Sequence, residues 1–383
     1  MPGETGGVAR SAGQFPRAGL ALFCLSLLMT VGFGGCKSDP PPGGAPNATP
    51  NPVVATPGGT TATNPSSATL RSSYEPFDGD RAYAILKKQC GFGVRPLGTA
   101  AHEKTKDYLI AEMQKVADST VTQKFTYHGM PVTNVIGVFN PAGSDKPSAH
   151  PILLMAHWDT RPIADGPYSD KRKPGYKYGA QGWKPTAPIM GANDGASGVA
   201  ALLEIARILK RQKPATGVLL LLDDGEDYGD FRMVNNRGEG VELGSRYFAE
   251  HFKETPAFGH PFYGILLDMV GGKEAVFPRE EFSEINAKSV NDKVYTAADQ
   301  LGYGRVFLSS KAQPVNDDHI AINMAGIPMI DIIHPLPQGA KHADEELAYR
   351  YWHTQQDTAD KCSPKTLKIV GDVVLKVLYS ETP

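Results

Sequence analysis

The chain has 383 residues, of which 41% are hydrophobic, and it carries 39 basic against 41 acidic side chains. A formal charge of −2 lacks the basic excess of a nucleic-acid-binding surface, so we expect no nucleic-acid partner. Length and hydrophobic content are typical of a globular, enzyme-sized domain, and composition alone points to no other partner.

Residues 1–35 have the pattern of an export signal. Basic side chains precede the apolar stretch GLALFCLSLLMTVGFGGC, which runs from Gly19 to Cys36. The basic flank and the small residues at its end indicate a secretory signal rather than a membrane span. The pair Gly34-Gly35 before Cys36 resembles a bacterial lipobox, which makes Cys36 the candidate lipidation site; the alternative is a cleaved signal with an incidental cysteine. We expect an exported bacterial lipoprotein, anchored at the periplasmic face of a membrane or at the cell surface.

Residues 36–72 are rich in Pro, Gly, Thr and Asn and contain little that could form a core. Such a composition predicts an extended tether. A tether directly after a lipidated cysteine suits a membrane-anchored enzyme, whose catalytic domain we place at residues 73–383.

Two cysteines, Cys90 and Cys362, fall in this predicted domain. In an exported protein they can form one intramolecular disulfide. The alternative is a pair of buried free thiols, because sequence gives no distance between them.

The predicted domain alternates helices with short apolar strands. Amphipathic helical patterns occupy 81–90, 102–117, 198–212 and 291–302, and strand-like alternation covers 121–129 and 131–140. Nearly continuous apolar runs follow at 151–157, 217–223, 263–271 and 327–333. Strands that are apolar on both faces indicate a sheet covered on both sides by helices. We therefore predict a single-domain, three-layer α/β/α fold with a mixed, mostly parallel central sheet.

Polar residues follow these apolar runs, where ligands bind in such sheets. They are His157 and Asp159, Asp194 before a helix, Glu226 and Asp227, Asp268, Asp317, and His353 near the C-terminus. Taken singly, each has another explanation, such as a helix cap or a solvated acidic face. Carboxylates gathered at one edge would raise one another's pKa unless a cation were present. Histidine with carboxylate suits Zn²⁺, so the pattern predicts a zinc site.

The ordered motifs HWD, GANDGASG, DGED, LLDMVG, DDH, AGIP and WHT resemble those of the M28-type zinc exopeptidases. Within that group they are most similar to the glutaminyl-peptide cyclotransferases (glutaminyl cyclases). The resemblance covers roughly residues 80–380. It implies the zinc-exopeptidase fold and a zinc-dependent acyltransferase that converts an N-terminal glutamine into pyroglutamate with release of ammonia.

The resemblance also implies roles for individual residues. Asp194, Asp227 and His353 would hold one zinc ion. Glu226 would be the general acid/base, and Asp268 and Asp317 would form an acidic network beside the substrate amine. The implied substrate-binding residues are Trp352, which would wall the pocket, and Asp331, which stands where animal cyclases have His. A further pocket Trp of the family has no clear match in this sequence, and Trp183 or Trp158 would take its place.

Two alternatives remain. In an M28 aminopeptidase, His157 and Asp268 would join the ligands, Asp194 would bridge two zinc ions, and Glu226 would activate a water. DDH in place of SDH, and Trp352 before the histidine, favour the cyclase. A non-catalytic, metal-containing binding lipoprotein would have no use for Glu226 beside a ligand. In either enzyme the partners would be peptide or protein N-termini, and we expect a monomer held to the membrane through its lipid.

Overall fold

The computed structural model describes residues 74–169, 187–229, 240–337 and 345–382. The predicted export signal, the lipidation site Cys36, the tether and Trp183 lie outside these residues. Among the described helices, none combines the length and the apolar character needed to span a membrane.

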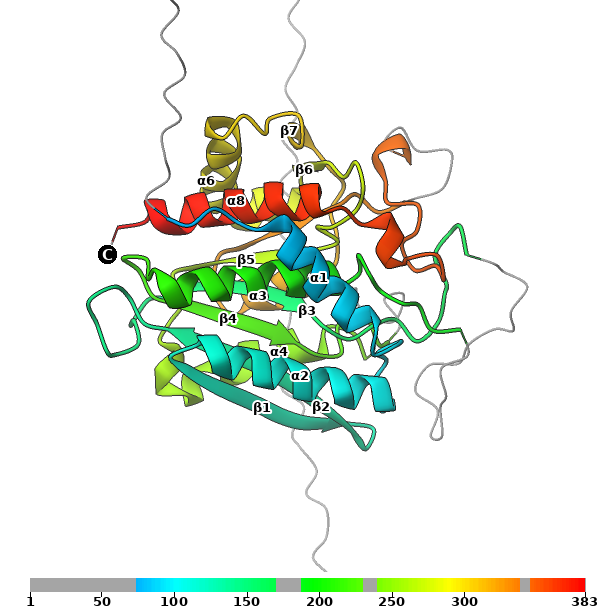
Figure 1. The fold of residues 1–383 in the computed structure, drawn as a ribbon, viewed down its shortest axis with the longest axis horizontal. Helices are drawn as coiled ribbons and strands as arrows, with labels where there is room; N and C mark the ends of the chain where they lie inside the picture. The colour runs from blue at the N-terminus through cyan, green and yellow to red at the C-terminus, as the bar shows by residue number, and fades with distance from the viewer. Residues whose placement is uncertain (1–73, 170–186, 230–239, 338–344, 383) are drawn as a thin grey trace, which may run out of the picture. The chain divides into compact units, whose positions relative to one another are not determined.

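A six-stranded sheet with the order β1-β2-β4-β3-β5-β8 forms the centre of the fold (Figure 1). The strands are β1 (Ser119–Tyr127), β2 (Met130–Phe139), β3 (Ile152–His157), β4 (Val218–Asp223), β5 (Tyr263–Asp268) and β8 (Met329–Ile333). β1, β2 and β4 pair antiparallel, whereas β4, β3, β5 and β8 run parallel. A small parallel pair, β6 (Phe277–Arg279) with β7 (Phe307–Lys311), lies apart from it. The predicted mixed, mostly parallel sheet is confirmed.

Helices cover both faces of this sheet. They are α1 (Gly79–Cys90), α2 (Ala100–Val116), α3 (Ala196–Arg211), α4 (Leu243–His251), α5 (Glu281–Asn286), α6 (Lys288–Gln300), α7 (Asp318–Met324) and α8 (Pro364–Ser380). Short 3₁₀ turns occur at 252–254, 256–258, 345–347 and 359–361. In Figure 1, α1, α2, α3 and α8 lie in front of the sheet and α4 lies behind it. The three-layer architecture is therefore as expected.

The alternating side chains of β4 show why its sequence is apolar throughout. Leu220 and Leu222 pack into the core under α1, α3 and α8, whereas Leu219 and Leu221 pack with Phe248 of α4 on the other face. Successive residues of a strand point to opposite faces, so a strand buried on both sides needs an apolar residue at every position. The run ends where the polar residues of the sheet edge begin.

The predicted disulfide is wrong: Cys90 and Cys362 are free thiols. Cys90 ends α1, and Cys362 is buried after the last 3₁₀ turn, where it pairs with Gly272 through a backbone bridge. Burial raises the pKa of both thiols, so they remain in the protonated, less reactive form.

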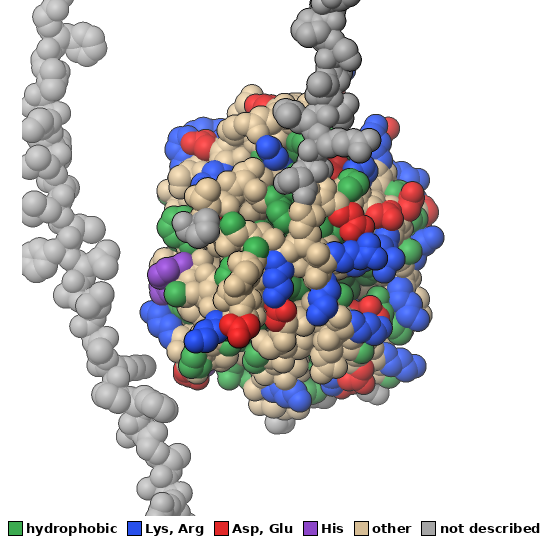
Figure 2. Space-filling view, turned by 60° about the vertical axis from the view of Figure 1, so that its left-hand side comes forward, with side chains coloured by type: hydrophobic (Ala, Val, Ile, Leu, Met, Phe, Trp, Pro, Cys, Tyr) green, Lys and Arg blue, Asp and Glu red, His purple; other side chains and the backbone are tan. Residues whose placement is uncertain are grey.

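Basic and acidic side chains are interspersed on the face drawn in Figure 2. This distribution agrees with the near-zero net charge of the sequence.

Candidate metal centre

The carboxyl ends of three neighbouring parallel strands deliver the polar groups of the site. His157 is the last residue of β3, Asp268 is the last residue of β5, and Glu226 and Asp227 lie just beyond the end of β4. The register pairs His157 with Asp223, so β3 and β4 end side by side. Apolar strands that end together therefore bring these side chains to one edge of the sheet.

The first cluster consists of Asp194, Asp227 and His353. Each offers one ligand atom within 4.8 Å of the others, and all three residues are buried. Nε2 of His353 lies 3.1 Å from Oδ1 of Asp227 and 3.6 Å from Oδ2 of Asp194. This is the ligand set that the sequence predicted.

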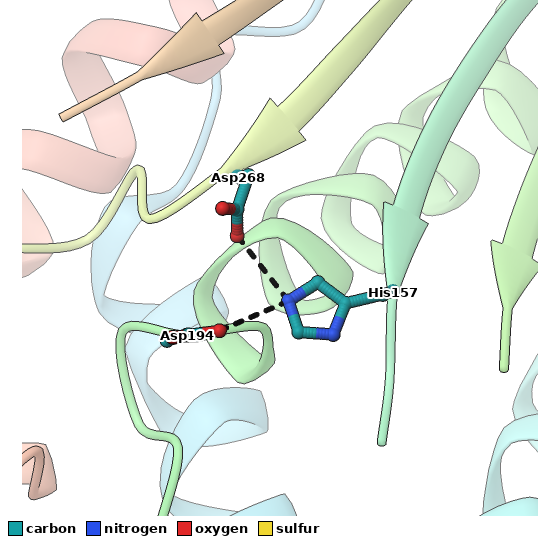
Figure 3. Close-up of side chains that lie close together, drawn as sticks. All are labelled: His157, Asp194 and Asp268. Carbon is teal, nitrogen blue, oxygen red and sulfur yellow. Dashed lines mark hydrogen bonds and ion pairs between the residues drawn. The ribbon is translucent and has the colours of Figure 1, made fainter. Parts of the chain in front are cut away.

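The second cluster consists of His157, Asp194 and Asp268, shown in Figure 3. Nε2 of His157 lies 3.1 Å from Oδ1 of Asp194 and 3.3 Å from Oδ1 of Asp268. Asp194 belongs to both clusters and offers a different oxygen to each histidine. The second-metal candidates are thus placed where a second ion would need them.

The donor chemistry of the first cluster fits zinc. Two carboxylates and an imidazole form a nitrogen–oxygen set that leaves a coordination position open for catalysis. Oδ2 of Asp227 is buried and has no hydrogen-bond partner among the described residues, as expected of an oxygen reserved for a cation. Burial lowers the pKa of His353, but Asp227 and Asp165 outweigh it and raise that pKa to about 9. The site therefore attracts positive charge.

Asp357 fixes the loop that carries Asp194. Its carboxylate accepts hydrogen bonds from the backbone N–H groups of Asn193 and Asp194, at 2.9 and 3.1 Å, and from the hydroxyl of Tyr349. Burial, and then the charge of Asp194, raise the pKa of Asp357 to about 7. Sequence analysis missed Asp357, although it lies four residues after His353.

Two glycines of GANDGASG permit the close approach of this loop. A Cβ on Gly195 would lie 2.3 Å from Nε2 of His157, and a Cβ on Gly198 would lie 2.0 Å from the carbonyl oxygen of Leu267. Side chains at these positions would separate α3 from β5 and Asp194 from His157. Glycine is therefore required at these two positions of the motif because a larger residue would not fit.

Asp159 holds the turn that carries Glu226 and Asp227. Its carboxylate accepts the backbone N–H groups of these residues, at 3.1 and 3.3 Å, and lies 3.4 Å from Nδ1 of His157. We expected Asp159 to orient an imidazole. In the structure it also binds the backbone of the turn that carries Glu226 and Asp227.

Glu226 lies beside the metal clusters without belonging to either. Its Oε2 is 3.9 Å from Nδ1 of His157, and 7% of the residue is exposed, against 1% of Asp227. Burial raises the pKa of Glu226 well above the usual range. The charge of His157 lowers that pKa, whereas the charges of Asp227 and Asp317 raise it further. A raised pKa lets a carboxyl group hold a proton more readily, which suits a group that must accept a proton and donate it again.

Asp268, Asp317 and Asp331 form a buried acidic network. Burial raises the pKa of all three carboxyl groups. The charges of Asp317 and Asp268 act on Asp331 in the same direction. No hydrogen-bond partner among the described residues reaches the oxygens of Asp331. Asp331, only 2% exposed, contacts Asp317 rather than an open surface.

The two described tryptophans differ in their exposure and their contacts, which the sequence did not predict. Trp352 is partly exposed and stacks on His353 with 3.9 Å between ring centroids. Trp158 is fully buried, stacks on His102 and donates from Nε1 to the carbonyl of Thr133. Trp158 is therefore a core residue, and its expected role as a substitute pocket wall is wrong.

The acidic residues just before Glu226 are structural. Asp223 and Asp224 are fully buried. Asp224 accepts from Nε2 of His102 at 2.8 Å and from the backbone N–H of Thr133 at 2.7 Å. Burial, and then the charge of Asp318, raise the pKa of Asp223. Asp230, the remaining carboxylate of this stretch, lies outside the described residues.

Comparisons with known proteins agree with this geometry. A family model described as "Peptidase family M28" matches residues 134–378. A glutaminyl cyclase from Bacteroides thetaiotaomicron, solved with N-acetylhistamine bound, is 36% identical with a TM-score of 0.67; the match covers 81% of this chain and 100% of that one. A Zn-dependent exopeptidase from Parabacteroides distasonis is 35% identical with a TM-score of 0.68, over 81% and 100%.

A curated relative is a peptidase. The aminopeptidase YwaD of Bacillus subtilis is 23% identical over 248 residues, which are 64% of this chain and 44% of that protein. The chain thus spans less than half the length of this relative.

Proposed function

The chain belongs to peptidase family M28, and from this premise we propose that it is a zinc-dependent glutaminyl-peptide cyclotransferase. Its substrates would be peptides or proteins with an N-terminal glutamine, and its products pyroglutamate and ammonia. The observation that carries the proposal is the acidic network: Asp268 is hydrogen-bond distance from His157 on one side and electrostatically coupled to Asp317 and Asp331 on the other. Asp317 and Asp331 add buried carboxyl groups beside Asp268, and this concentration of negative charge suits the α-amine of a substrate.

Asp194, Asp227 and His353 would hold the zinc ion. When bound there, zinc supplies the Lewis acidity that polarises the γ-carbonyl of the substrate glutamine.

Glu226 would move the proton. The α-amine of the glutamine attacks its own γ-carbonyl carbon, so the new C–N bond closes the ring while the bond to the amide nitrogen breaks. Glu226 takes one proton from the attacking amine and gives it to the departing nitrogen, which leaves as ammonia. Its raised pKa suits both transfers. No water is consumed, and the intramolecular attack needs no covalent enzyme intermediate.

The acidic network would bind the amine end of the substrate. Asp317 raises the pKa of Glu226 through its charge, which places the network near the proton carrier. Carboxyl groups at this position can accept hydrogen bonds from the α-amine and orient it for attack. Trp352, stacked on His353 and partly exposed, would cover the substrate side chain.

The second cluster favours a second candidate function, that of an M28 aminopeptidase. With His157 and Asp268 as additional ligands, Asp194 could bridge two ions, and Glu226 would instead deprotonate a water. The relative YwaD is an aminopeptidase. The cyclase is preferred because the buried acids Asp317 and Asp331 stand beside Asp268, where they suit a substrate amine.

Incubation with a Gln-initiated peptide, followed by mass spectrometry, distinguishes the two. The cyclase should remove the mass of ammonia and leave the peptide bond intact. Loss of a whole N-terminal residue would instead identify a peptidase. A peptide that starts with Leu is the control, because only the peptidase can act on it.

We also propose that the enzyme acts outside the cytoplasm as a monomer, held to a membrane by a lipid on Cys36. The apolar segment, the small residues before Cys36 and the Pro- and Gly-rich residues after it support this placement. Replacement of Cys36 by Ser should move the protein from the membrane fraction to the soluble fraction.

A further inference from the structure

We propose that Arg161 is a positioning residue that holds two of the three metal ligands, Asp227 directly and His353 through Asp165. This inference rests on the metal-binding part of the proposed function and is independent of the reaction that the site performs. Neither Arg161 nor Asp165 belongs to the ligand clusters.

The guanidinium of Arg161 joins two carboxylates. Its side chain is only 2% exposed. Nη1 donates to Oδ1 of Asp227 at 3.2 Å and to the carbonyl oxygens of Asp227 and Gly229, both at 3.1 Å. Nε and Nη2 donate to the two oxygens of Asp165, at 2.8 and 2.7 Å. One rigid, planar group therefore fixes the side chain and the main chain of a metal ligand and also orients a second carboxylate.

Asp165 passes this orientation to His353. Its Oδ1 lies 3.1 Å from Nδ1 of His353. An ionised carboxylate only accepts, so Nδ1 carries a proton, and the opposite nitrogen, Nε2, faces Asp227 and Asp194. A carboxylate behind a metal-binding histidine sets the tautomer and the direction of its ring.

The same short segment also holds the backbone of His353. The N–H of Gly166 donates to the carbonyl oxygen of His353 at 3.1 Å. His353 has φ of 51°, a left-handed conformation that is unfavourable for a side chain of this size and needs support from its surroundings. A Cβ on Gly166 would lie 2.2 Å from the carbonyl oxygen of Trp352, so the two segments are in close contact. Residues 161–166 therefore clamp the histidine from both its ring and its main chain.

A role of Arg161 through its charge and a role through holding the ligands predict opposite changes in zinc affinity, so the proposal is testable. If Arg161 acted only through its positive charge, its removal would leave Asp165 unneutralised and would tighten zinc binding. If it acts by holding the ligands, its removal lets Asp227 and His353 turn, and zinc binding weakens. Loss of a group behind a metal ligand typically costs about 10–100-fold in affinity.

Four variants separate these roles when zinc affinity is measured by competition with a chromogenic chelator. Arg161→Gln and Asp165→Asn change the local charge in opposite directions. Arg161→Lys keeps the positive charge but loses the planar guanidinium that binds both carboxylates. The double variant R161Q/D165N keeps the summed charge of the two positions. Positioning predicts that all four bind zinc more weakly, by about 10-fold or more. A role through charge alone predicts tighter binding for Arg161→Gln and unchanged binding for Arg161→Lys and the double variant.

The control is Arg207→Gln on α3, which breaks ion pairs with Glu204 and Glu75 outside the site and should leave zinc affinity unchanged. The thermal unfolding midpoint of each metal-free variant checks that it is folded. If Arg161→Gln does not fold, Arg161→Lys decides, because Asp165→Asn weakens zinc binding under either role. Zinc affinity within about twofold of wild type in Arg161→Lys would overturn the proposal. If the wild-type protein binds no zinc, both the positioning role of Arg161 and the metal centre are contradicted. If it binds zinc but does not cyclise the peptide, only the proposed reaction is contradicted.

Discussion

Oδ1 of Asp194 lies 3.1 Å from Nε2 of His157, while the other oxygen of Asp194 faces His353. One carboxylate thus stands between two imidazoles, each of which belongs to a different candidate cluster. The function of the protein depends on whether both clusters or only one hold zinc.

Metal content after substitution of each histidine answers this question. In the cyclase, His353→Ala should lose zinc, whereas His157→Ala should retain one ion per chain, because His157 lies outside the first cluster. Zinc per chain is measured by elemental analysis after dialysis, with His251→Ala on α4 as the control. Two ions in wild type and one in His157→Ala would support the aminopeptidase.

Glu226→Gln should reduce turnover by about 10²–10⁴-fold, the usual contribution of a general acid/base. The amide keeps the size of the side chain but cannot carry the proton. Zinc content should remain at the wild-type value, because Glu226 is in neither cluster. The exposed Glu250→Gln on α4 is the matched control. Near-normal activity in Glu226→Gln would mean that another group moves the proton.

Asp331→Asn should slow the reaction by about tenfold, the effect of weakening one interaction with a charged group. The amide removes a carboxyl group that interacts with Asp317 and so changes the charge around the substrate amine. The rate constant at saturating substrate is the measurement, and Asp299→Asn on the exposed side of α6 is the control. If the rate were unchanged, Asp331 would be a passive neighbour of Asp317.

Acid should destabilise the fold partly through His334. Burial lowers the pKa of His334 to about 4, and Nε2 lies 3.0 Å from the carbonyl oxygen of Leu347. The folded pKa is below the unfolded value of about 6.5, so unfolding takes up a proton between these pH values. Stability from this group is therefore complete above about pH 6.5 and is lost towards pH 4, by roughly 3 kcal/mol at most.

His334→Gln keeps an N–H donor for Leu347 but does not titrate. Urea unfolding at several pH values between 4 and 7 should give a shallower loss of unfolding free energy for this variant than for wild type. Parallel curves for the two proteins would contradict the assignment.

Both thiols of the catalytic unit should be chemically free. Alkylation of unfolded, unreduced protein followed by peptide mapping should modify Cys90 and Cys362, and both should react slowly in the folded protein, because burial raises their pKa. Recovery of the two cysteines as one linked peptide would show that they are bridged after all.

The metal ligands could be predicted because each follows a buried strand or lies in a distinctive motif. The end of an apolar run marks the sheet edge, and this places His157, Asp227 and Asp268 together. Periodicity also located α1, α2, α3 and α6, because a face packed on the sheet must be apolar.

What escaped prediction depends on contacts between distant parts of the chain. Asp165 meets His353 across 188 positions, and nothing local marks either Asp165 or Arg161 as part of a metal site. Trp158 looked like a pocket residue because it adjoins His157. It faces the core instead, since side chains of neighbouring residues point to opposite sides. Nothing local in the sequence shows that Asp224 pairs with His102 of α2.

The turn that carries His353 and Asp357 also determines when the centre can assemble. Most of the other groups are encoded earlier, between the ends of β3 and β5, yet one ligand and the support of the Asp194 loop come from the last part of the chain. A nascent polypeptide that has produced the whole sheet still lacks both. Metal capture therefore requires synthesis to pass residue 357, and products terminated between β8 and this turn should emerge without zinc.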